Sequence, residues 1–194
     1  MKLLVQVGSN DGTDIHGKPD LAAQLILNEG YYGHLIEPND SVIPELRKTY
    51  RSAQFGSIKI HTGFLIGPRP EPLTNFFVAS DNRHSSVNDG FAASHGDNTV
   101  KVKRLPVITL SEFFAREKIS KLNTLIVDTE GGDFDIIMSA PFDQVYIKTV
   151  VFEHLHLSGP NKIGENFFKI VRFLTEKGFH FIDVRGFDTA MTRT

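Results

Sequence analysis

The sequence predicts an α/β fold in which a mostly parallel sheet carries helices on both faces. The first strand leads directly through a glycine turn into a helix, and short apolar runs then alternate with helical segments. No internal repeat or linker interrupts this alternation. A chain of 194 residues suits a single domain with a sizeable core, so we expect one domain over residues 1–194.

The first dozen residues contain the predicted ligand-binding turn. An apolar run ends at Val7, the turn Gly-Ser-Asn-Asp-Gly follows at positions 8–12, and a helix is expected over about 19–30. A strand, a glycine turn and a helix together present backbone N–H groups to a nucleotide-like ligand. Gly8 and Gly12 lack the Cβ atoms that would block its close approach.

The spacing of these glycines narrows the class of ligand. A dinucleotide fingerprint requires a further glycine between Gly8 and Gly12, and a phosphate-binding P-loop ends in Lys-Ser or Lys-Thr. The turn has neither feature. A ligand without phosphate fits better, and S-adenosylmethionine is one. The alternative is an ordinary tight turn between a strand and a helix.

A second apolar run, at 34–37, ends on Glu37, which lies 25 residues beyond Gly12. In doubly wound folds a carboxylate at the end of the second strand accepts hydrogen bonds from ribose hydroxyls. We therefore expect Glu37 to bind a ribose. The alternative is that Glu37 caps the next helix, which is expected to run to about Tyr50, or pairs with a surface cation.

The middle of the chain is expected to be less regular. A third strand is predicted near 57–64, followed by a stiff loop containing Pro68, Pro70 and Pro72, and another strand at 76–79. The polar segment 80–98 is too long for a turn and is typical of a functional lid. A half-exposed strand is predicted at 100–103, and a helix capped by Thr109 or Ser111 follows.

The last third of the chain returns to buried strands. The runs at 122–128 and 148–153 end on Asp128 and Glu153, and a short helix at 133–138 separates them. Phe and aliphatic residues at helical spacing predict a helix over 161–177. The segments 179–184 and 189–192 are expected to form a closing antiparallel hairpin.

The four predicted buried strands all end on glycine or on acidic residues. Ligands in open α/β sheets bind at the carboxyl ends of the strands, where these residues would lie together. A sulfonium donor is cationic at its reactive centre and carries an ammonium group at its amino-acid end. An acidic rim therefore suits S-adenosylmethionine. The rim consists of the turn at 8–12, Glu37, Asp128, Glu130, Glu153 and His154.

Four segments of the chain carry a family resemblance. They read Val-Gln-Val-Gly-Ser-Asn-Asp-Gly at 5–12, Ile-Glu-Pro-Asn at 36–39, Ile-Val-Asp-Thr-Glu-Gly at 126–131 and Val-Phe-Glu at 151–153. Together with Ser85-Ser86 and the run at 107–110, they resemble the FkbM family of S-adenosylmethionine-dependent methyltransferases. The most specific parts are Glu-Pro-Asn and Asp-x-Glu-Gly, and the resemblance spans nearly the whole chain.

This resemblance implies a Rossmann-like class I methyltransferase fold and O-methylation of a hydroxyl on a small molecule or a sugar. It also implies a donor site in which Glu37 binds the ribose and Asp128 lies near the methionine part or the acceptor. The remaining implied donor-binding residues are Gly8, Ser9, Asn10 and Gly12.

Two positions depart from the family pattern. Gln6 stands where the family usually has an acid, which weakens a contact to the glycine turn or to the donor. Asp11 replaces a residue that is typically apolar and changes how the turn packs. Because Gln6 replaces this acid, the alternative of a methyltransferase-like protein that binds the donor without turnover stays open.

An alcohol acceptor needs a base that takes its proton during methyl transfer. Glu130, just past a strand end, is the first choice, and Asp128, Glu153, His154 and His84 are the other candidates. The alternative for Asp128 and Glu130 is a helix cap and a solvated side chain. For His84, in the predicted lid, the alternative is plain exposure.

A rival interpretation uses the same residues as a metal site. Asp128, Glu130, Glu153, His154 and His156 offer ligands suited to Mg²⁺, Mn²⁺ or Zn²⁺. The protein would then be a metal-dependent hydrolase, or a methyltransferase whose metal lowers the pKa of the acceptor hydroxyl. However, His154 and His156 alternate on an extended segment and would point to opposite faces. Our first interpretation therefore includes no metal.

Composition limits the other partners. The net charge is −2 with scattered basic residues, so we expect no nucleic-acid binding. The absence of cysteine excludes disulfides and a thiolate nucleophile. No apolar run approaches the ~20 residues of a membrane helix. We expect a cytoplasmic protein with a hydroxylated small-molecule or saccharide acceptor, and the sequence leaves its oligomeric state open.

Overall fold

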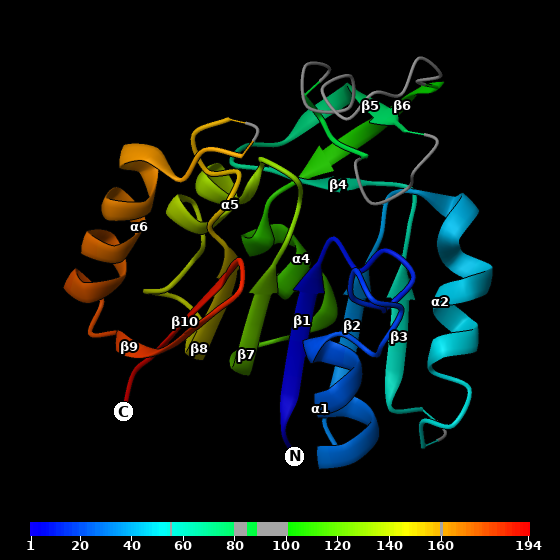
Figure 1. Ribbon diagram of the computed structural model, residues 1–194, viewed down its shortest axis with the longest axis horizontal. Coiled ribbons are helices and arrows are strands. Elements are labelled where there is room, and N and C mark those ends of the chain that lie inside the picture. The colour runs from blue at the N-terminus through cyan, green and yellow to red at the C-terminus, as the bar shows by residue number, and fades with distance from the viewer. Residues whose placement is uncertain (55, 80–84, 89–100, 160) are drawn as a thin grey trace.

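A seven-stranded sheet forms the centre of the computed structural model, which describes residues 1–54, 56–79, 85–88, 101–159 and 161–194 (Figure 1). The strand order is β3-β2-β1-β7-β8-β10-β9, and β10 runs antiparallel to both of its neighbours. The strands are β1 (Leu3–Val7), β2 (Tyr32–Ile36), β3 (Ile58–His61), β7 (Lys121–Val127), β8 (Tyr146–Glu153), β9 (His180–Arg185) and β10 (Asp188–Thr192).

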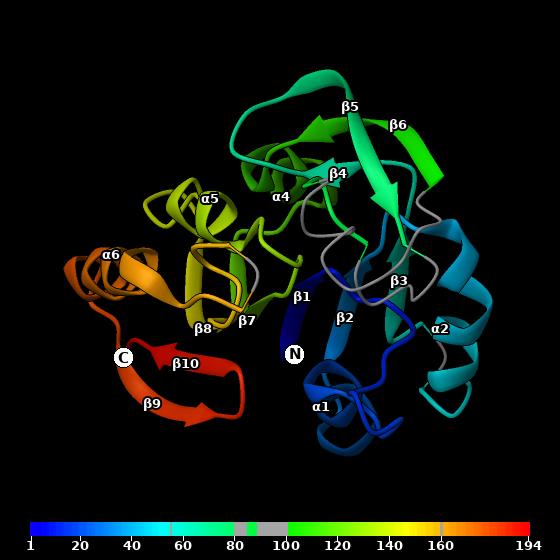
Figure 2. The same cartoon turned by 45° about the horizontal axis from the view of Figure 1, so that its top comes forward.

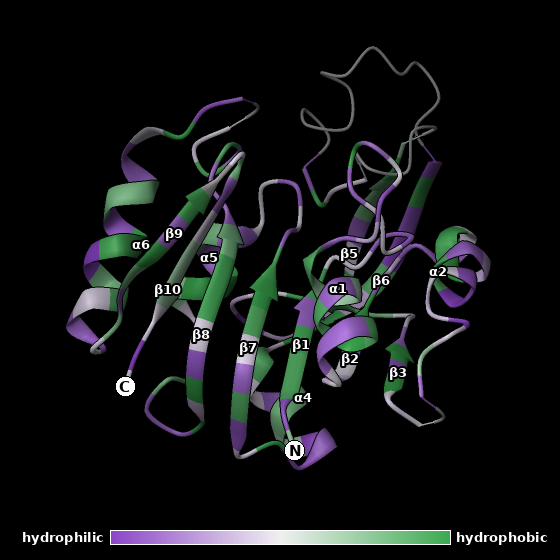
Figure 3. Cartoon of the chain, turned by 60° about the horizontal axis from the view of Figure 1, so that its bottom comes forward, coloured by the Kyte–Doolittle hydropathy of each residue, from purple (hydrophilic) through white to green (hydrophobic). Residues whose placement is uncertain are grey.

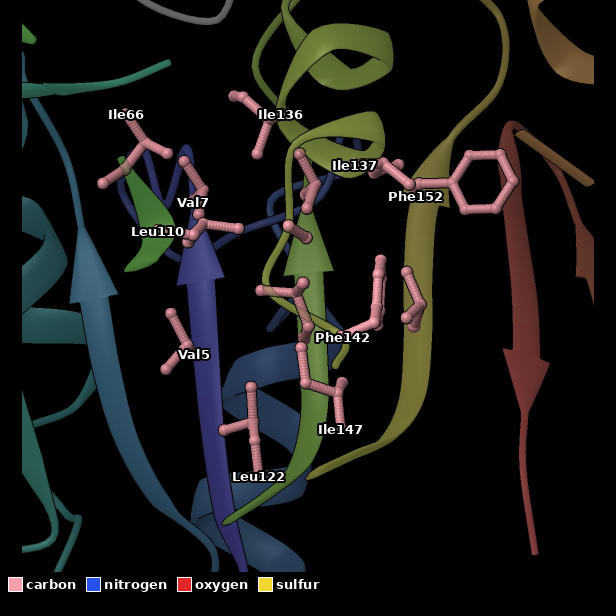
Figure 4. Close-up of a cluster of buried hydrophobic side chains, with 14 of the residues drawn as sticks. Val5, Val7, Ile66, Leu110, Leu122, Ile136, Ile137, Phe142, Ile147 and Phe152 are labelled. Carbon is pink, nitrogen blue, oxygen red and sulfur yellow. The ribbon is translucent and has the colours of Figure 1, made fainter. Parts of the chain in front are cut away.

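Helices cover both faces of this sheet. On one face α1 and α2 pack against Leu4, Leu35 and Ile126, and on the other α4, α5 and α6 pack against alternate residues such as Val5 and Val127. Figure 4 shows the second of these layers, and Figure 3 shows hydrophobic residues along β1, β7 and β8. The helices are α1 (Leu21–Glu29), α2 (Ile43–Thr49), α4 (Leu110–Glu117), α5 (Asp133–Met138) and α6 (Gly164–Glu176).

Residues at the helix ends explain where two helices begin. Asp20 caps α1 by accepting a hydrogen bond from the Ala23 N–H at 2.7 Å. The Thr109 hydroxyl caps α4 by accepting a hydrogen bond from the Glu112 N–H, and the Glu112 carboxylate accepts one from the Thr109 N–H. The two residues therefore form a capping box. Of the two caps predicted for α4, Thr109 is confirmed.

The predicted fold class is confirmed: the sheet is mostly parallel, helices lie on both faces and an antiparallel hairpin closes the C-terminal side. The hairpin consists of β9 and β10, close to the predicted segments. That residues 1–194 form one domain stays a prediction.

A second sheet was not predicted. Its three strands, in the order β4-β6-β5, are β4 (Leu65–Ile66), β5 (Glu71–Val78) and β6 (Lys101–Ile108). Pro72 was expected in a loop but lies within β5. Proline is tolerated there because β5 is an edge strand and its pairing with β6 is irregular between Glu71 and Thr74. This small sheet lies beyond the carboxyl ends of the central strands (Figures 1 and 2).

Within the parts of the chain listed above, no helix combines the length and the apolar character needed to cross a membrane.

Candidate active site

An open cleft with about 690 Å³ of empty space lies between the carboxyl ends of β1, β2 and β7 and the small sheet. Its two walls differ in chemistry. The central strands contribute Gly8, Asn10, Glu37, Asp128 and Glu130, whereas the side of the small sheet contributes Leu65, Ile66, Phe76 and Val87. A ligand bound here would contact polar and acidic groups on one side and apolar side chains on the other.

The glycine turn is shaped by close contact with the end of β7. Gly8 has φ of +81°, and a Cβ added to it would lie 1.7 Å from the Asp128 carbonyl oxygen. The Asp128 N–H donates to the Val7 carbonyl at 3.0 Å, which holds the two strand ends together. Gly8 is therefore required by packing as well as by its backbone angle.

The other predicted turn residues differ in where they lie. Asn10 lines the cleft with φ of +42°. Ser9 is buried, and Gly12, with φ of +77°, packs against Leu46, Thr49 and Tyr50 of the α2 region. Ser9 and Gly12 are not among the residues that line the cleft. Their predicted contribution to donor binding would act through the shape of the turn.

Glu37 connects the turn to the segment that follows β2. One of its carboxylate oxygens accepts a hydrogen bond from the Asn10 N–H and the other from the Asn39 N–H, both at 2.7 Å. Burial raises the pKa of Glu37 to about 7, and these two bonds oppose that rise. Glu37 therefore lies in the cleft and fixes the turn, and it is not a surface ion pair.

The two departures from the family pattern have visible partners. The Gln6 amide donates to the Asp20 carboxylate at 2.8 Å, so Gln6 links β1 to the cap of α1. Asp11 accepts hydrogen bonds from the N–H and the hydroxyl of Thr13, at 2.9 and 2.6 Å. Both polar side chains are thus used within the turn region, and neither lines the cleft.

Asp128 and Glu130 follow β7 and line the cleft, and β1 separates β7 from β2, the strand that leads to Glu37. Enclosure by the protein, reinforced by Glu130, raises the pKa of Asp128. The Asp128 side chain is nevertheless exposed to the cleft. Water in the open cleft solvates this carboxylate and opposes the rise.

The backbone of Glu130 is held in an unusual conformation. Its φ is +55°, a region that L-residues rarely adopt, and its carbonyl accepts a hydrogen bond from the Ser86 hydroxyl at 2.9 Å. Ser86 is paired in turn with Phe77 of β5 through two backbone hydrogen bonds of 2.8 and 3.0 Å. The small sheet therefore helps to position Glu130.

Glu130 also belongs to a group of three side chains that we call the acid–imidazole cluster: Glu130, Glu153 and His156. His156 Nε2 lies 3.4 Å from Glu153 Oε1 and 3.8 Å from Glu130 Oε2. Burial, reinforced by Asp128 and Glu130, raises the pKa of Glu153 to about 10. Glu153 therefore holds a proton more readily than a solvent-exposed carboxylate does.

The hydrogen bonding of His156 argues against the metal alternative. The Asn161 N–H donates to His156 Nδ1 at 3.0 Å, so the neutral ring carries its proton on Nε2. That protonated nitrogen faces the carboxyl groups of Glu130 and Glu153, whereas a metal ligand needs a lone pair there. His154 does not join the cluster, because its Nδ1 lies 3.0 Å from the Thr189 hydroxyl. The arrangement fits proton binding better than metal binding.

The sequence placed His156 with Glu130 and Glu153 only as a candidate metal ligand, and it did not predict the apolar wall of the cleft. His156 follows β8 by three residues, and no strand-end rule selects it. The wall comes from Leu65, Ile66 and Phe76, whose strands belong to the unpredicted sheet. His84, a candidate base, lies outside the described residues, as does most of the predicted lid at 80–98.

The sequence that forms this cleft matches a known protein family. A model of the methyltransferase FkbM domain matches residues 6–181. The chain belongs to the FkbM methyltransferase family. This confirms the family, and with it an S-adenosylmethionine-dependent methyltransferase, as predicted from the four motifs. No curated protein matches this FkbM chain by sequence.

Solved structures share the fold of this FkbM protein at low identity. The O-methyltransferase TomG of Streptomyces achromogenes, solved with S-adenosylmethionine, has 11% identity and a TM-score of 0.54, with 100% of this chain and 73% of TomG covered. An O-methyltransferase of Bacillus cereus, solved with S-adenosylhomocysteine, has 8% identity and a TM-score of 0.51, with coverage of 99% and 74%.

The fibrillarin pre-rRNA processing protein of Methanococcus jannaschii is similar to the same extent, with 11% identity, a TM-score of 0.52 and coverage of 99% and 66%. Because such different proteins share this fold, the fold does not select the acceptor.

Proposed function

We propose that this FkbM protein is an O-methyltransferase that methylates a hydroxyl of a small molecule or a saccharide. The observation that carries the proposal is the placement of Glu37 and Glu130 on the same cleft, one beside the glycine turn and the other beside the acid–imidazole cluster. The first suits recognition of a ribose, and the second suits removal of a proton from an alcohol.

Donor binding would use the turn and Glu37. S-adenosylmethionine, when bound, supplies a methyl group on a cationic sulfur. Glu37 would accept hydrogen bonds from the ribose hydroxyls through the lone pairs that its two backbone bonds leave, and Asn10 lies beside it. Asp128, exposed in the cleft, would face the ammonium group or the acceptor. The acidic wall therefore complements a cation.

The base would be Glu130. In the proposed reaction the acceptor oxygen bonds to the methyl carbon while the carbon–sulfur bond breaks, and the hydroxyl proton moves to a Glu130 carboxylate oxygen. The raised pKa of Glu153 supports this assignment, because a carboxyl group that already holds a proton is not available to accept another. His156 Nε2–H would position Glu130 from behind. The apolar wall would exclude water from the reacting atoms.

Calorimetry separates this function from its alternatives. We expect S-adenosylhomocysteine to bind without added metal, and binding of a divalent metal alone in the cleft would favour the hydrolase. A screen of hydroxylated acceptors with methyl-labelled donor then tests turnover. Labelled methyl ethers support the proposal. Donor binding with methylated amines, methylated RNA or no product would contradict it.

Glu37→Ala is expected to weaken the binding of S-adenosylhomocysteine by about 1–3 kcal/mol. The change removes the acceptor of the ribose hydroxyls and leaves the Asn10 and Asn39 N–H groups without their carboxylate. Calorimetric titration measures the effect. Glu45→Ala, on the exposed surface of α2, is the matched control and should leave the affinity unchanged. Equal affinity in the two variants would remove Glu37 from the site.

The affinity for S-adenosylhomocysteine is expected to fall about tenfold between pH 8 and pH 6. The ionised form of Glu37 is the better acceptor for hydroxyl groups. Its pKa of about 7 means that it gains a proton as the pH falls through this window. Titrations at several pH values measure the profile. Glu37→Ala should flatten it, and an unchanged slope in that variant would assign the pH dependence to another group.

A further inference from the structure

A second group of ionisable side chains lies outside the cleft and has no part in the proposed reaction. His34 of β2, His61 at the end of β3 and Glu117 at the end of α4 meet on the sheet face that α4 covers. His34 Nδ1 lies 3.0 Å from His61 Nε2 and 3.8 Å from Glu117 Oε2. None of the three is among the residues that line the cleft.

The two imidazoles are enclosed and neutral. Their ring planes are nearly parallel, with 7° between them, and Phe113 packs against each in a T-shaped contact at centroid distances of 5.9 and 5.0 Å. Burial lowers the pKa of His34 to about 4 and also lowers that of His61.

The spacing of the three ligand atoms suits a tetrahedral ion. Zinc binds imidazole nitrogen at about 2.0–2.1 Å, so two ligands of a tetrahedral site lie about 3.3 Å apart. The two distances from His34 Nδ1, 3.0 Å to His61 Nε2 and 3.8 Å to Glu117 Oε2, lie on either side of this value. Glu117 approaches His61 at its other nitrogen, Nδ1, at 4.0 Å, so the His61 ring must turn for its Nε2 to share an ion with Glu117. Two imidazoles and one carboxylate form a donor set that zinc uses with water as the fourth ligand.

We propose that His34, His61 and Glu117 bind a divalent transition metal of the zinc type. In the metal-free arrangement one of the two facing nitrogens carries a proton. Metal binding moves that proton to the other nitrogen of the same ring, and small rotations of both rings direct their lone pairs at the ion. No proton has to leave the protein. The ion would then join β2, β3 and α4.

Two cationic side chains beside Glu117 would compete with a metal ion for its carboxylate and so lower the metal affinity. Lys59 Nζ lies 3.3 Å from Glu117 Oε2, and Arg116 Nε lies 3.4 Å from Glu117 Oε1. Both cations form ion pairs with the carboxylate that would bind the metal. Lys59 is largely exposed, with 61% of its side chain accessible. Removal of its charge should therefore tighten metal binding without disturbing the core.

The site also adjoins the donor cleft through the backbone. The His61 carbonyl accepts a hydrogen bond of 2.9 Å from the Glu37 N–H, and His34 lies on the strand that ends beside Glu37. A metal that fixes His34 and His61 would thus hold the strand ends next to Glu37. This role is structural, because the ion would not touch the donor.

Titration of the chelator-treated full chain with Co²⁺, followed by competition with Zn²⁺, tests the proposal. We expect one Co²⁺ per chain with the visible absorption of a tetrahedral site, and a rise in the thermal midpoint. His61→Ala and Glu117→Gln should weaken the affinity by at least about tenfold, whereas Lys59→Met should tighten it. Glu117→Gln and Lys59→Met change side chains at the edge of the group and leave both imidazoles in place. These two variants therefore test the proposal even if His61→Ala does not fold.

Two controls locate the ion. His180→Ala, on the exposed strand β9, should leave Co²⁺ affinity unchanged. His156→Ala should do the same, because His156 belongs to the acid–imidazole cluster. Failure to bind Co²⁺ or Zn²⁺, equal affinity in wild type and Glu117→Gln, or loss of binding only in His156→Ala would overturn the proposal. Donor binding and methyl transfer are measured in separate assays, so these outcomes are distinct from those that test the proposed function.

Discussion

Gly8→Ala is expected to lower the free energy of unfolding by about 3 kcal/mol or more and to abolish donor binding. The added Cβ would lie 1.7 Å from the Asp128 carbonyl oxygen, far inside van der Waals contact. Both groups belong to the backbone of paired strands, so relief requires β1 and β7 to separate at the cleft. Denaturant unfolding and calorimetry with S-adenosylhomocysteine measure the two effects.

Gly63→Ala provides the matched control for this change. Gly63 has φ of +84°, close to the +81° of Gly8, but no atom lies within 4 Å of an added Cβ. Its substitution should cost only the ~1–2 kcal/mol of a left-handed backbone. The difference between the two variants isolates the collision with Asp128. Equal losses would mean that the backbone angle alone explains the requirement for glycine.

Much of the fold was predictable because strand ends carry chemical information. Parallel strands bring their carboxyl ends to one edge, so Gly8, Glu37 and Asp128, far apart in sequence, were expected near one another, and they line one cleft. Helix caps such as Thr109 are local signals and were also readable.

The remainder depends on contacts that no local pattern encodes. Pro72 was assigned to a loop because proline breaks strands, yet an edge strand with irregular pairing accommodates it. His156 reaches Glu130 only through the chain path after β8, and its tautomer depends on the Asn161 N–H. His34 and His61 were not singled out, because each stands alone in its strand and only pairing of β2 with β3 brings them together.

Glu130→Gln is expected to lower kcat by about 10²–10⁴-fold, with the affinity for S-adenosylhomocysteine changed by less than a factor of a few. The amide keeps the size of the side chain but cannot accept the proton of the acceptor hydroxyl. Single-turnover transfer of labelled methyl to an acceptor found by screening measures the chemical step directly.

A variant of the neighbouring residue Glu153 shows which of the two carboxyl groups accepts the proton. Glu153→Gln should cause a smaller loss of turnover, because glutamine resembles the protonated acid that the raised pKa of Glu153 favours. Glu165→Gln, an exposed change on α6, should have no effect. If Glu153→Gln proved more damaging than Glu130→Gln, the proton would pass to Glu153 instead. Equal turnover in wild type and Glu130→Gln would mean that the acceptor loses its proton without this carboxylate, and that the cluster serves only to shape the cleft.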